Sequence, residues 1–186
     1  MMKVLSLWPV LFYGCLCETS TDPRKETEAD VPFIRSITEA AFKTTEHSSH
    51  TEHWIIDALR RNDQLTISRV AALDNKIVGH VAISPVTIAS GEKDWYGLGP
   101  ISVLPEHQGQ GVGALLMKEA LADIKATGAG GCVVLGDPDY YGKFGFKARS
   151  EIFYAGVPPQ YFQALAFADK FPAGEVHYHE SFSATE

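Results

Sequence analysis

The stretch "EHQGQGVGALLMKEAL", Glu106–Leu121, places three glycines within five residues, directly before a run of good helix formers. Glycine loses more backbone freedom on folding than any other residue, so Gly109, Gly111 and Gly113 need a local reason. The first amides of a helix have no internal partners and lie at the positive end of its dipole, and glycines let an anion approach them closely. The segment therefore predicts a loop that binds a phosphate or pyrophosphate at a helix start. The plain alternative is a strand-to-helix turn.

Two common phosphate motifs do not fit this loop. A dinucleotide fingerprint needs G-x-G-x-x-G, whereas here the order is G-x-G-x-G followed by Ala114. No suitably placed acidic residue ends the next expected strand. A P-loop needs Gly-Lys-Ser/Thr, which the chain lacks. Both nucleotide-binding classes are therefore excluded.

The bulk composition limits the class of protein. The chain has 186 residues, enough for one domain with a real core, and a net charge of -7 that argues against a nucleic-acid binder. Its three cysteines, Cys15, Cys17 and Cys132, form neither a disulfide framework nor a zinc pattern, and Cys132 lies in an apolar run that predicts a buried thiol. His177 and His179 share one strand face, but no third ligand accompanies them. We predict no metal.

The N-terminal region, residues 1–23, differs from the rest. Its apolar run, Val4–Leu16, is too short to span a bilayer as a helix, so no stable membrane span is predicted. Residues 1–17 resemble a signal peptide, with small residues near Cys17. The alternative is an upstream extension without a targeting role, such as a start codon chosen too early. We favour the extension and a cytoplasmic protein, with export as the alternative, and place the folded domain at residues 24–186.

Periodicity and breakers predict a mixed arrangement of helices and strands. Helices are expected from an N-cap at Asp30 to Phe42, over Thr51–Arg61, over Gly113–Ala126, and briefly within Asp137–Phe146. Strands are expected at Leu65–Leu73, Ile77–Ile88, Asp94–Val103, Cys132–Gly136, Glu151–Gly156, Tyr161–Phe167 and Glu175–Phe182. The connection from Ile101 to Leu135 is long enough for a right-handed crossover between parallel strands. Antiparallel strands are expected on both sides of that unit.

The order Gln108-x-x-Gly111-x-Gly113, preceded by "ISVLP" and followed by "ALLMKEAL", resembles the acyl-CoA signature of the GNAT N-acetyltransferase superfamily. Further segments are similar to a branch of small, predicted bacterial N-acetyltransferases: Gly79–Ile88, Leu98–Gly113, Val133–Phe146 and Gly174–Phe182. The resemblance runs from about Arg24 to Phe182. It implies an α+β (mixed α/β) fold, in which a central mixed sheet with splayed parallel strands is flanked by helices.

The resemblance also implies a cosubstrate, acetyl-CoA, and where it would bind. The pantetheine arm would lie along Ile101, Ser102 and Val103, and an amide near Val103 would stabilise the oxyanion. The pyrophosphate would lie on the loop residues Gln108, Gly109, Gln110, Gly111, Val112 and Gly113. Because the protein and coenzyme A are both anionic, local amides rather than long-range steering must hold the cosubstrate.

Tyr141 is the expected general acid, because it stands four residues before Gly145 in "YGKFGF", where family members carry a tyrosine beside the thiol. It would also contact the cofactor. The plain alternative is a packed aromatic on a short helix, the role expected of Tyr140. Asp137 is a second catalytic candidate, near the position where many relatives have an Asn that opens a longer segment.

The general base stays open. Many relatives carry a glutamate on the strand before the loop, but Trp95–Val103 contains no carboxylate. Asp137, Glu106, His80 and His107 are candidates, and a water chain to bulk solvent is an equal alternative.

Three function classes follow. The first is an acetyltransferase whose acceptor is a small amine, a protein N-terminus or a lysine, attacked directly in a ternary complex by a monomer or homodimer. The second is an acyl-CoA-binding sensor without transfer activity. The third is an exported or anchored protein that uses only the scaffold. The sequence does not identify the acceptor, because the acceptor groove is built from divergent segments.

Overall fold

The structure, a computed structural model, describes residues 21–43, 45, 48–168 and 170–186. The predicted apolar run and the signal-like segment lie outside these residues, as do Cys15 and Cys17. The first strand begins at Asp22, just ahead of the predicted domain start. The boundary between extension and domain stays a prediction.

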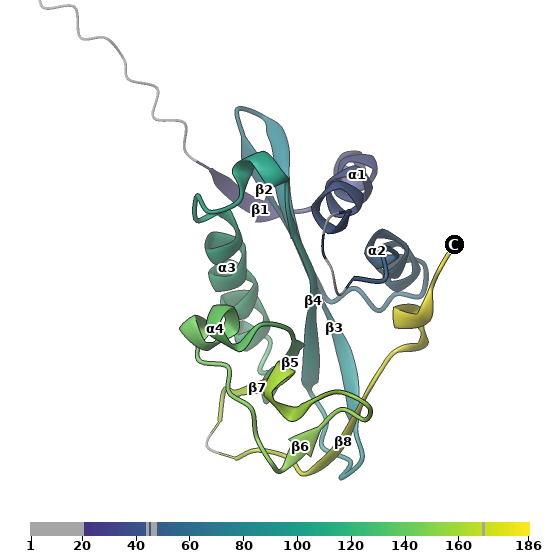
Figure 1. Cartoon of the computed structure of the whole chain (residues 1–186), viewed down its shortest axis with the longest axis vertical. Coiled ribbons are helices and arrows are strands. Elements are labelled where there is room, and N and C mark those ends of the chain that lie inside the picture. Colours follow the sequence, from purple (N-terminus) through teal and green to yellow (C-terminus); the bar gives the residue numbers. More distant parts are fainter. Residues whose placement is uncertain (1–20, 44, 46–47, 169) are drawn as a thin grey trace, which may run out of the picture.

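The described chain folds into a mixed sheet with helices on both faces, which confirms the predicted fold class (Figure 1). The helices are α1 (Val31–Phe42), α2 (Glu52–Arg61), α3 (Val112–Ala126) and α4 (Pro138–Tyr141). The strands are β1 (Asp22–Lys25), β2 (Ile67–Leu73), β3 (Lys76–Ile88), β4 (Trp95–Val103), β5 (Gly131–Leu135), β6 (Ile152–Phe153), β7 (Phe162–Ala166) and β8 (Gly174–Tyr178). Helices α1 and α2 cover one face, and α3 covers the other (Figure 1).

The main strand order is β1-β2-β3-β4-β5-β7. Only β4 and β5 are parallel neighbours in that order, and α3 joins them as the predicted crossover. Strand β3 is long enough to pair with β2 along its first part and with β8 at Val86–Ile88. Strand β4 pairs with β3 on the other side, so the last strand of the chain joins the centre of the sheet.

Strands β4 and β5 separate part-way along. Their pairing runs from Trp95 opposite Gly131 to Leu98 opposite Val134. Strand β4 continues its pairing with β3 as far as Val103. A register shift interrupts the β3–β4 pairing where Gly99 and Pro100 stand, and breakers of this kind mark bulges and bends in strands. Among the described residues, the β5-facing edge of residues 99–103 therefore has no strand partner, which is the predicted splay.

The core fills both faces of the sheet. On the α3 face, Leu116, Met117, Ala120 and Ile124 are fully buried at the spacing of one helix stripe. On the other face, Ile34 of α1 packs in one cluster with Ile56 and Val70. The predicted buried thiol at Cys132 is confirmed, with no exposed surface.

The start of α1 differs from the prediction. Asp30 stands at the N-cap position, but its side chain does not cap the helix. Instead, its carboxylate accepts two hydrogen bonds from Arg24, at 2.6 and 2.8 Å, and one from the backbone of Thr27 at 2.7 Å. The carboxylate therefore ties the end of β1 to the turn before α1.

The tail strands are shorter than predicted. The segment expected as a strand to Phe182 ends at Tyr178, and a 3₁₀ turn follows over Glu180–Ser183. The His179 side chain accepts a hydrogen bond from the Ser181 amide at 3.2 Å, and such local bonds compete with strand pairing. Similarly, only Ile152–Phe153 of the expected strand at residues 151–156 is paired.

Candidate active site

Two glycines of the loop have a left-handed backbone conformation, and no described side chain covers them. Gly109 and Gly111 have φ of 73° and 87°, and Gly111 is the N-cap of α3. A Cβ at either position would meet nothing within 4 Å. The two glycines are therefore required by the left-handed backbone rather than by crowding, and the space before them is free. The unpaired first amides of a helix of 15 residues face this loop.

Two glutamines fix the loop from within. Gln108 Nε2 donates to the carbonyl of Val103 at 3.0 Å, and Gln110 Nε2 donates to the carbonyl of Glu106 at 2.8 Å. The first bond ties the loop to the end of β4. The two predicted loop contacts at Gln108 and Gln110 thus have a structural role, and the exposed Glu106 side chain lies at the surface.

The open edge of β4 presents specific backbone groups. The amide of Leu104 donates to Val78 on β3 at 2.9 Å. Because hydrogen-bonding directions alternate along a strand, Val103 and Ile101 direct their amides and carbonyls away from β3, toward the gap. The backbone amide and carbonyl of Ser102 point toward β3 instead, and the residue is 2% exposed. Of the three predicted strand contacts, two therefore offer backbone groups to the gap.

Tyr141 lies beside the point where the strands part. Its ring covers Gly136, where a Cβ would collide with it. The ring packs against the core cluster that contains Leu98 and Val134, the last β4–β5 pair. Burial raises the pKa of the Tyr141 phenol, so this group is neutral at pH 7 and able to donate a proton.

Tyr140 lies in a different place from its neighbour. Its hydroxyl covers Gly113 at the start of α3, where a Cβ would be 2.8 Å from the oxygen. The ring stacks edge-on with Tyr141, with centroids 5.0 Å apart, and packs on Phe144. The packing role expected of Tyr140 is present, and its hydroxyl adds a contact at the helix start.

Asp137 holds the two tyrosines in register. Its Oδ1 accepts from the amide of Asp139 at 2.9 Å, and its carbonyl accepts from the amides of Tyr140 and Tyr141. The residue is exposed and caps α4. The structure therefore gives Asp137 a local structural role, and its catalytic role stays a prediction.

Tyr178 contacts β4 from the face opposite Tyr141, and no local sequence pattern predicted this contact. The ring of Tyr178 on β8 lies over Gly97, where a Cβ would collide with it. It contacts Tyr154 edge-on at 5.4 Å. Burial raises the pKa of the Tyr178 phenol, with smaller contributions from Cys132 and Tyr141. A glycine inside the strand was the one available sign of such a close approach.

Of the two candidate histidine bases, one is buried. His80 has no exposed surface, and its Nε2 lies 2.7 Å from Ser68 Oγ. Burial lowers the pKa of His80 to about 4, so the imidazole is neutral at pH 7. His107, in contrast, lies in the surface turn Pro105–His107 before the loop.

Within the described ranges, no group of three or more His, Cys, Asp or Glu side chains is placed to hold a metal ion. His177 is exposed, and its nearest acidic partner is Glu175 at 3.9 Å. Of the helices in the described part of the chain, none is long and apolar enough to cross a membrane.

The model of the acetyltransferase (GNAT) family matches residues 31–146, from the start of α1 to Phe146, just after the turn that follows Tyr141. The chain belongs to the GNAT acetyltransferase family. It is 31% identical over 168 residues to the uncharacterized N-acetyltransferase YhbS of Escherichia coli K12. That match covers 86% of this chain and 97% of YhbS, so the relatedness spans the whole domain.

Two solved GNAT structures share the fold in detail. A GNAT family acetyltransferase from Brucella melitensis, in complex with acetyl-CoA, is 48% identical with a TM-score of 0.79. That match covers 88% of this chain and 99% of the other. The structure of E. coli YhbS in complex with CoA is 29% identical with a TM-score of 0.81, and covers 89% and 93% of the two chains. The mixed sheet of this GNAT protein is therefore that of the family.

Proposed function

We propose that this GNAT protein transfers the acetyl group of acetyl-CoA to an amine, by direct attack in a ternary complex. The observation that carries the proposal is the open edge of β4, which ends at a glycine loop and a helix start. An extended pantetheine arm can pair with that edge while the diphosphate meets the helix amides. The B. melitensis and E. coli relatives, solved with acetyl-CoA and CoA, support the same choice of ligand.

In this proposal, Ile101 and Val103 pair with the pantetheine arm through their gap-facing backbone groups. The loop from Gln108 to Gly113 holds the pyrophosphate. No metal is required, because the anion is met by amides and by the helix dipole. The cytoplasm, which holds acetyl-CoA, is the proposed location.

The chemistry needs three groups. The amine nitrogen attacks the thioester carbonyl carbon, and an amide on the open edge of β4 near Val103 stabilises the oxyanion. The C–S bond then breaks, and Tyr141 donates its proton to the leaving thiolate. The ammonium form of the acceptor must also lose a proton, which costs about 5 kcal/mol at neutral pH for an amine of pKa ~10.4.

A second candidate function is an acyl-CoA-binding sensor without transfer. The observation that favours it is the lack of any carboxylate on β4, from Trp95 to Val103. A sensor and an enzyme bind the same ligand, so only turnover separates them.

The test is thiol release from acetyl-CoA in the presence of amines, polyamines, amino acids and peptides, with mass spectrometry of each product. The proposal expects an acetylated amine and an equal amount of free thiol for at least one acceptor class. Gly111→Val, which obstructs the loop, serves as the control without activity. Binding of acetyl-CoA without turnover on any acceptor would favour the sensor.

A further inference from the structure

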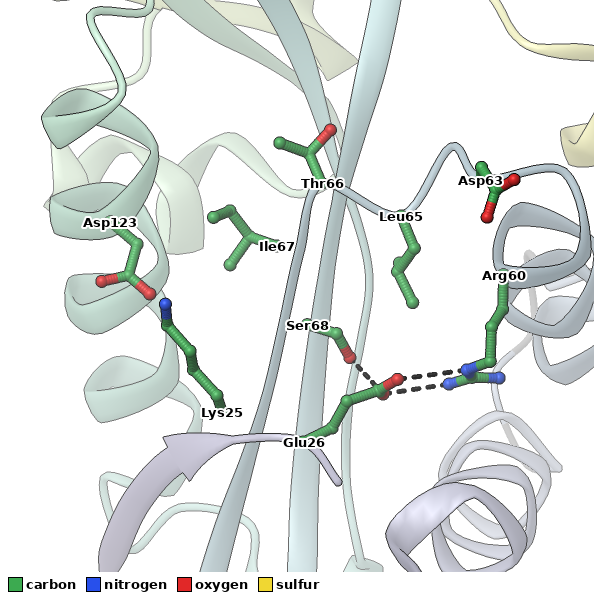
Figure 2. Close-up of a pocket in the computed structure, with 9 residues that line it drawn as sticks. All are labelled: Lys25, Glu26, Arg60, Asp63, Leu65, Thr66, Ile67, Ser68 and Asp123. Atoms are coloured by element: carbon green, nitrogen blue, oxygen red, sulfur yellow. Dashed lines mark hydrogen bonds and ion pairs between the residues drawn. The ribbon is translucent and has the colours of Figure 1, made fainter. Parts of the chain in front are cut away.

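A chain of hydrogen bonds fixes the protonation of His80. Arg60 donates twice to the carboxylate of Glu26, at 3.1 and 2.9 Å, and Ser68 Oγ donates to the same carboxylate (Figure 2). These donors keep the pKa of Glu26 below its usual value, against the effect of burial. Ser68 thus uses its one proton on Glu26, so His80 Nε2 must be the donor in its 2.7 Å bond to Ser68. A neutral His80 then carries a bare Nδ1.

A second chain of hydrogen bonds ends at Ser102. Thr38 Oγ1 donates to the carbonyl of Ile34 at 2.8 Å, so its proton is used. In the 3.1 Å contact between the hydroxyls of Thr38 and Ser102, Ser102 must therefore be the donor. The hydroxyl oxygen of Ser102 retains an unused lone pair in a buried position.

The two chains end at adjacent positions of the sheet. His80 and Ser102 are paired residues on β3 and β4, so their side chains lie on the same face, under α1. His80 Nδ1 is fully buried and has no hydrogen-bond partner among the described residues. A water molecule between two such acceptors can donate one hydrogen to each.

The polar positions continue toward the place where β4 and β5 separate. Ser84, also on β3, faces the same side, and its buried hydroxyl also lacks a partner in the described part of the chain. It is paired with Gly97, the residue before the last β4–β5 pair. Ser84 and His80 thus place two unsatisfied groups on one face of β3, with the buried Ala82 between them. Tyr141 packs on the other side of the sheet, against the cluster that contains α3.

We propose that His80 Nδ1 and Ser102 Oγ bind one buried water, and that this water and His80 accept the proton of the substrate amine. The inference rests on the proposed acetyl transfer. The proton passes from the amine nitrogen to the water, and a water proton passes to His80 Nδ1. The Nε2 proton moves to Ser68 Oγ, and the Ser68 proton moves to the carboxylate of Glu26.

The far end of this relay reaches the surface. Glu26, Ser68 and Arg60 line an open pocket on the edge of β2, between α2 and α3 (Figure 2). A proton on the Glu26 carboxyl can leave to solvent there. The charged groups that act on His80 are Glu26, from the segment after β1, and Arg60 of α2. The relay gives the amine proton a path to solvent, which no carboxylate on β4 provides.

The protonation of His80 is tested without any substrate, by ¹⁵N NMR of the histidine-labelled full chain. The structure requires one imidazole with Nε2 protonated and Nδ1 bare, unchanged between pH 5 and 8. A crystal structure at high resolution should show a water within hydrogen-bond distance of His80 Nδ1 and Ser102 Oγ. A His80 that carries its proton on Nδ1, or a dry site, overturns the proposal.

The relay is tested with a matched pair of histidine variants on an amine that supports turnover. His80→Gln retains a donor toward Ser68 but removes the basic Nδ1. We expect a fall in kcat of about 10²-fold at pH 7, an unchanged thermal shift with acetyl-CoA, and a rate that rises tenfold per pH unit toward the amine pKa. His53→Gln removes another buried histidine, on α2, and should keep the wild-type pH profile.

A wild-type pH profile in folded His80→Gln overturns the relay. If no amine is acetylated by the wild type, the proposed function fails and the relay falls with it. The NMR and crystallographic results then still decide whether the water site exists, so the two failures are distinguishable.

Discussion

Tyr140 and Tyr141 are adjacent in the sequence but pack on different glycines. The Tyr140 hydroxyl lies over Gly113 at the start of α3, and the Tyr141 ring lies over Gly136 after β5. Their rings meet edge-on, with an interplanar angle of 87°. Consecutive residues on a helix point about 100° apart, and both tyrosines lie on α4, which Asp137 caps. The tyrosine pair therefore spans from the proposed diphosphate loop to the proposed leaving group.

The first prediction concerns these two hydroxyls. Tyr141→Phe should lower turnover by about 10²-fold, the usual scale for the loss of a positioned acid. The substitution removes only the hydroxyl, so the packing of the ring is unchanged. Tyr140→Phe should keep nearly full turnover. Steady-state rates with a slow-leaving acyl donor measure the effect, since product release does not then hide the chemical step.

The tyrosine assignment fails if Tyr141→Phe equals the wild type under those conditions. Greater damage in Tyr140→Phe would instead move the acid role to the tyrosine over Gly113.

The second prediction compares two glycines that have the same left-handed backbone conformation. Gly111 and Gly128 have φ of 87° and 88°, and a Cβ at either position meets nothing within 4 Å. Valine at each should cost about 1–3 kcal/mol of stability, because this backbone region disfavours β-branched residues. Acetyl-CoA at 100 times its Kd should stabilise the folded protein by about 2.7 kcal/mol and so raise its Tm. Only Gly111→Val should lose this rise. Thermal melts with and without acetyl-CoA measure both effects.

An acetyl-CoA shift that survives in Gly111→Val would remove the loop from the binding site. Its loss in Gly128→Val as well would show a general effect of strain.

The third prediction concerns the Tyr178 ring over Gly97. Gly97→Ala should destabilise the protein by about 1–3 kcal/mol, because the new methyl group forces the ring off β4. Gly142→Ala, where a Cβ meets nothing within 4 Å and φ is helical, should change stability by no more than about 1 kcal/mol. Urea unfolding of both variants provides the comparison. Equal midpoints for the two variants would show that the ring does not lie on the strand.

The fourth prediction is a pH dependence at Asp30. The hydrogen bonds from Arg24, more than the opposing burial, hold the pKa of Asp30 well below its usual value. A lowered folded-state pKa stabilises the protein above the unfolded pKa of about 3.9, and this contribution is lost as the pH falls toward the folded value. Asp30→Asn should therefore cost about 1–2 kcal/mol at pH 7, with Arg24 partly solvated.

The difference between wild type and Asp30→Asn should shrink below about pH 4, as measured by urea unfolding at a series of pH values. The control is Asp74→Asn, an exposed turn position where Asn also accepts the positive φ of 49°. A cost for Asp30→Asn that is independent of pH would show that charge is not the cause.

Local patterns predicted most of the elements because their causes are local. The alternation in Leu65–Leu73 and the glycines before α3 depend on side-chain period and on backbone freedom, both of which a short window contains. The two glycines and the proline within Asp94–Val103 predict a bulge or splay inside that strand. The family resemblance adds that the two parallel strands separate.

Relations between distant segments were not predictable in the same way. The pairing of Tyr178 with Val86 and its contact on Gly97 join β8 to the centre of the sheet, and no local pattern encodes that register. The bond between His80 and Ser68 was missed for the same reason. Asp30 was assigned as a helix cap because the partner that engages it, Arg24, is visible only in three dimensions.

The unpaired edge of β4, residues 99–103, has a consequence for the protein without ligand. A free strand edge is a template for foreign strands, and most sheets keep such edges short, charged or covered. Here the edge lies in the middle of the sheet, and the ligand proposed to pair with it would be its cover. Coenzyme A would then act on the protein as a protector against strand-mediated self-association, in addition to being a reactant.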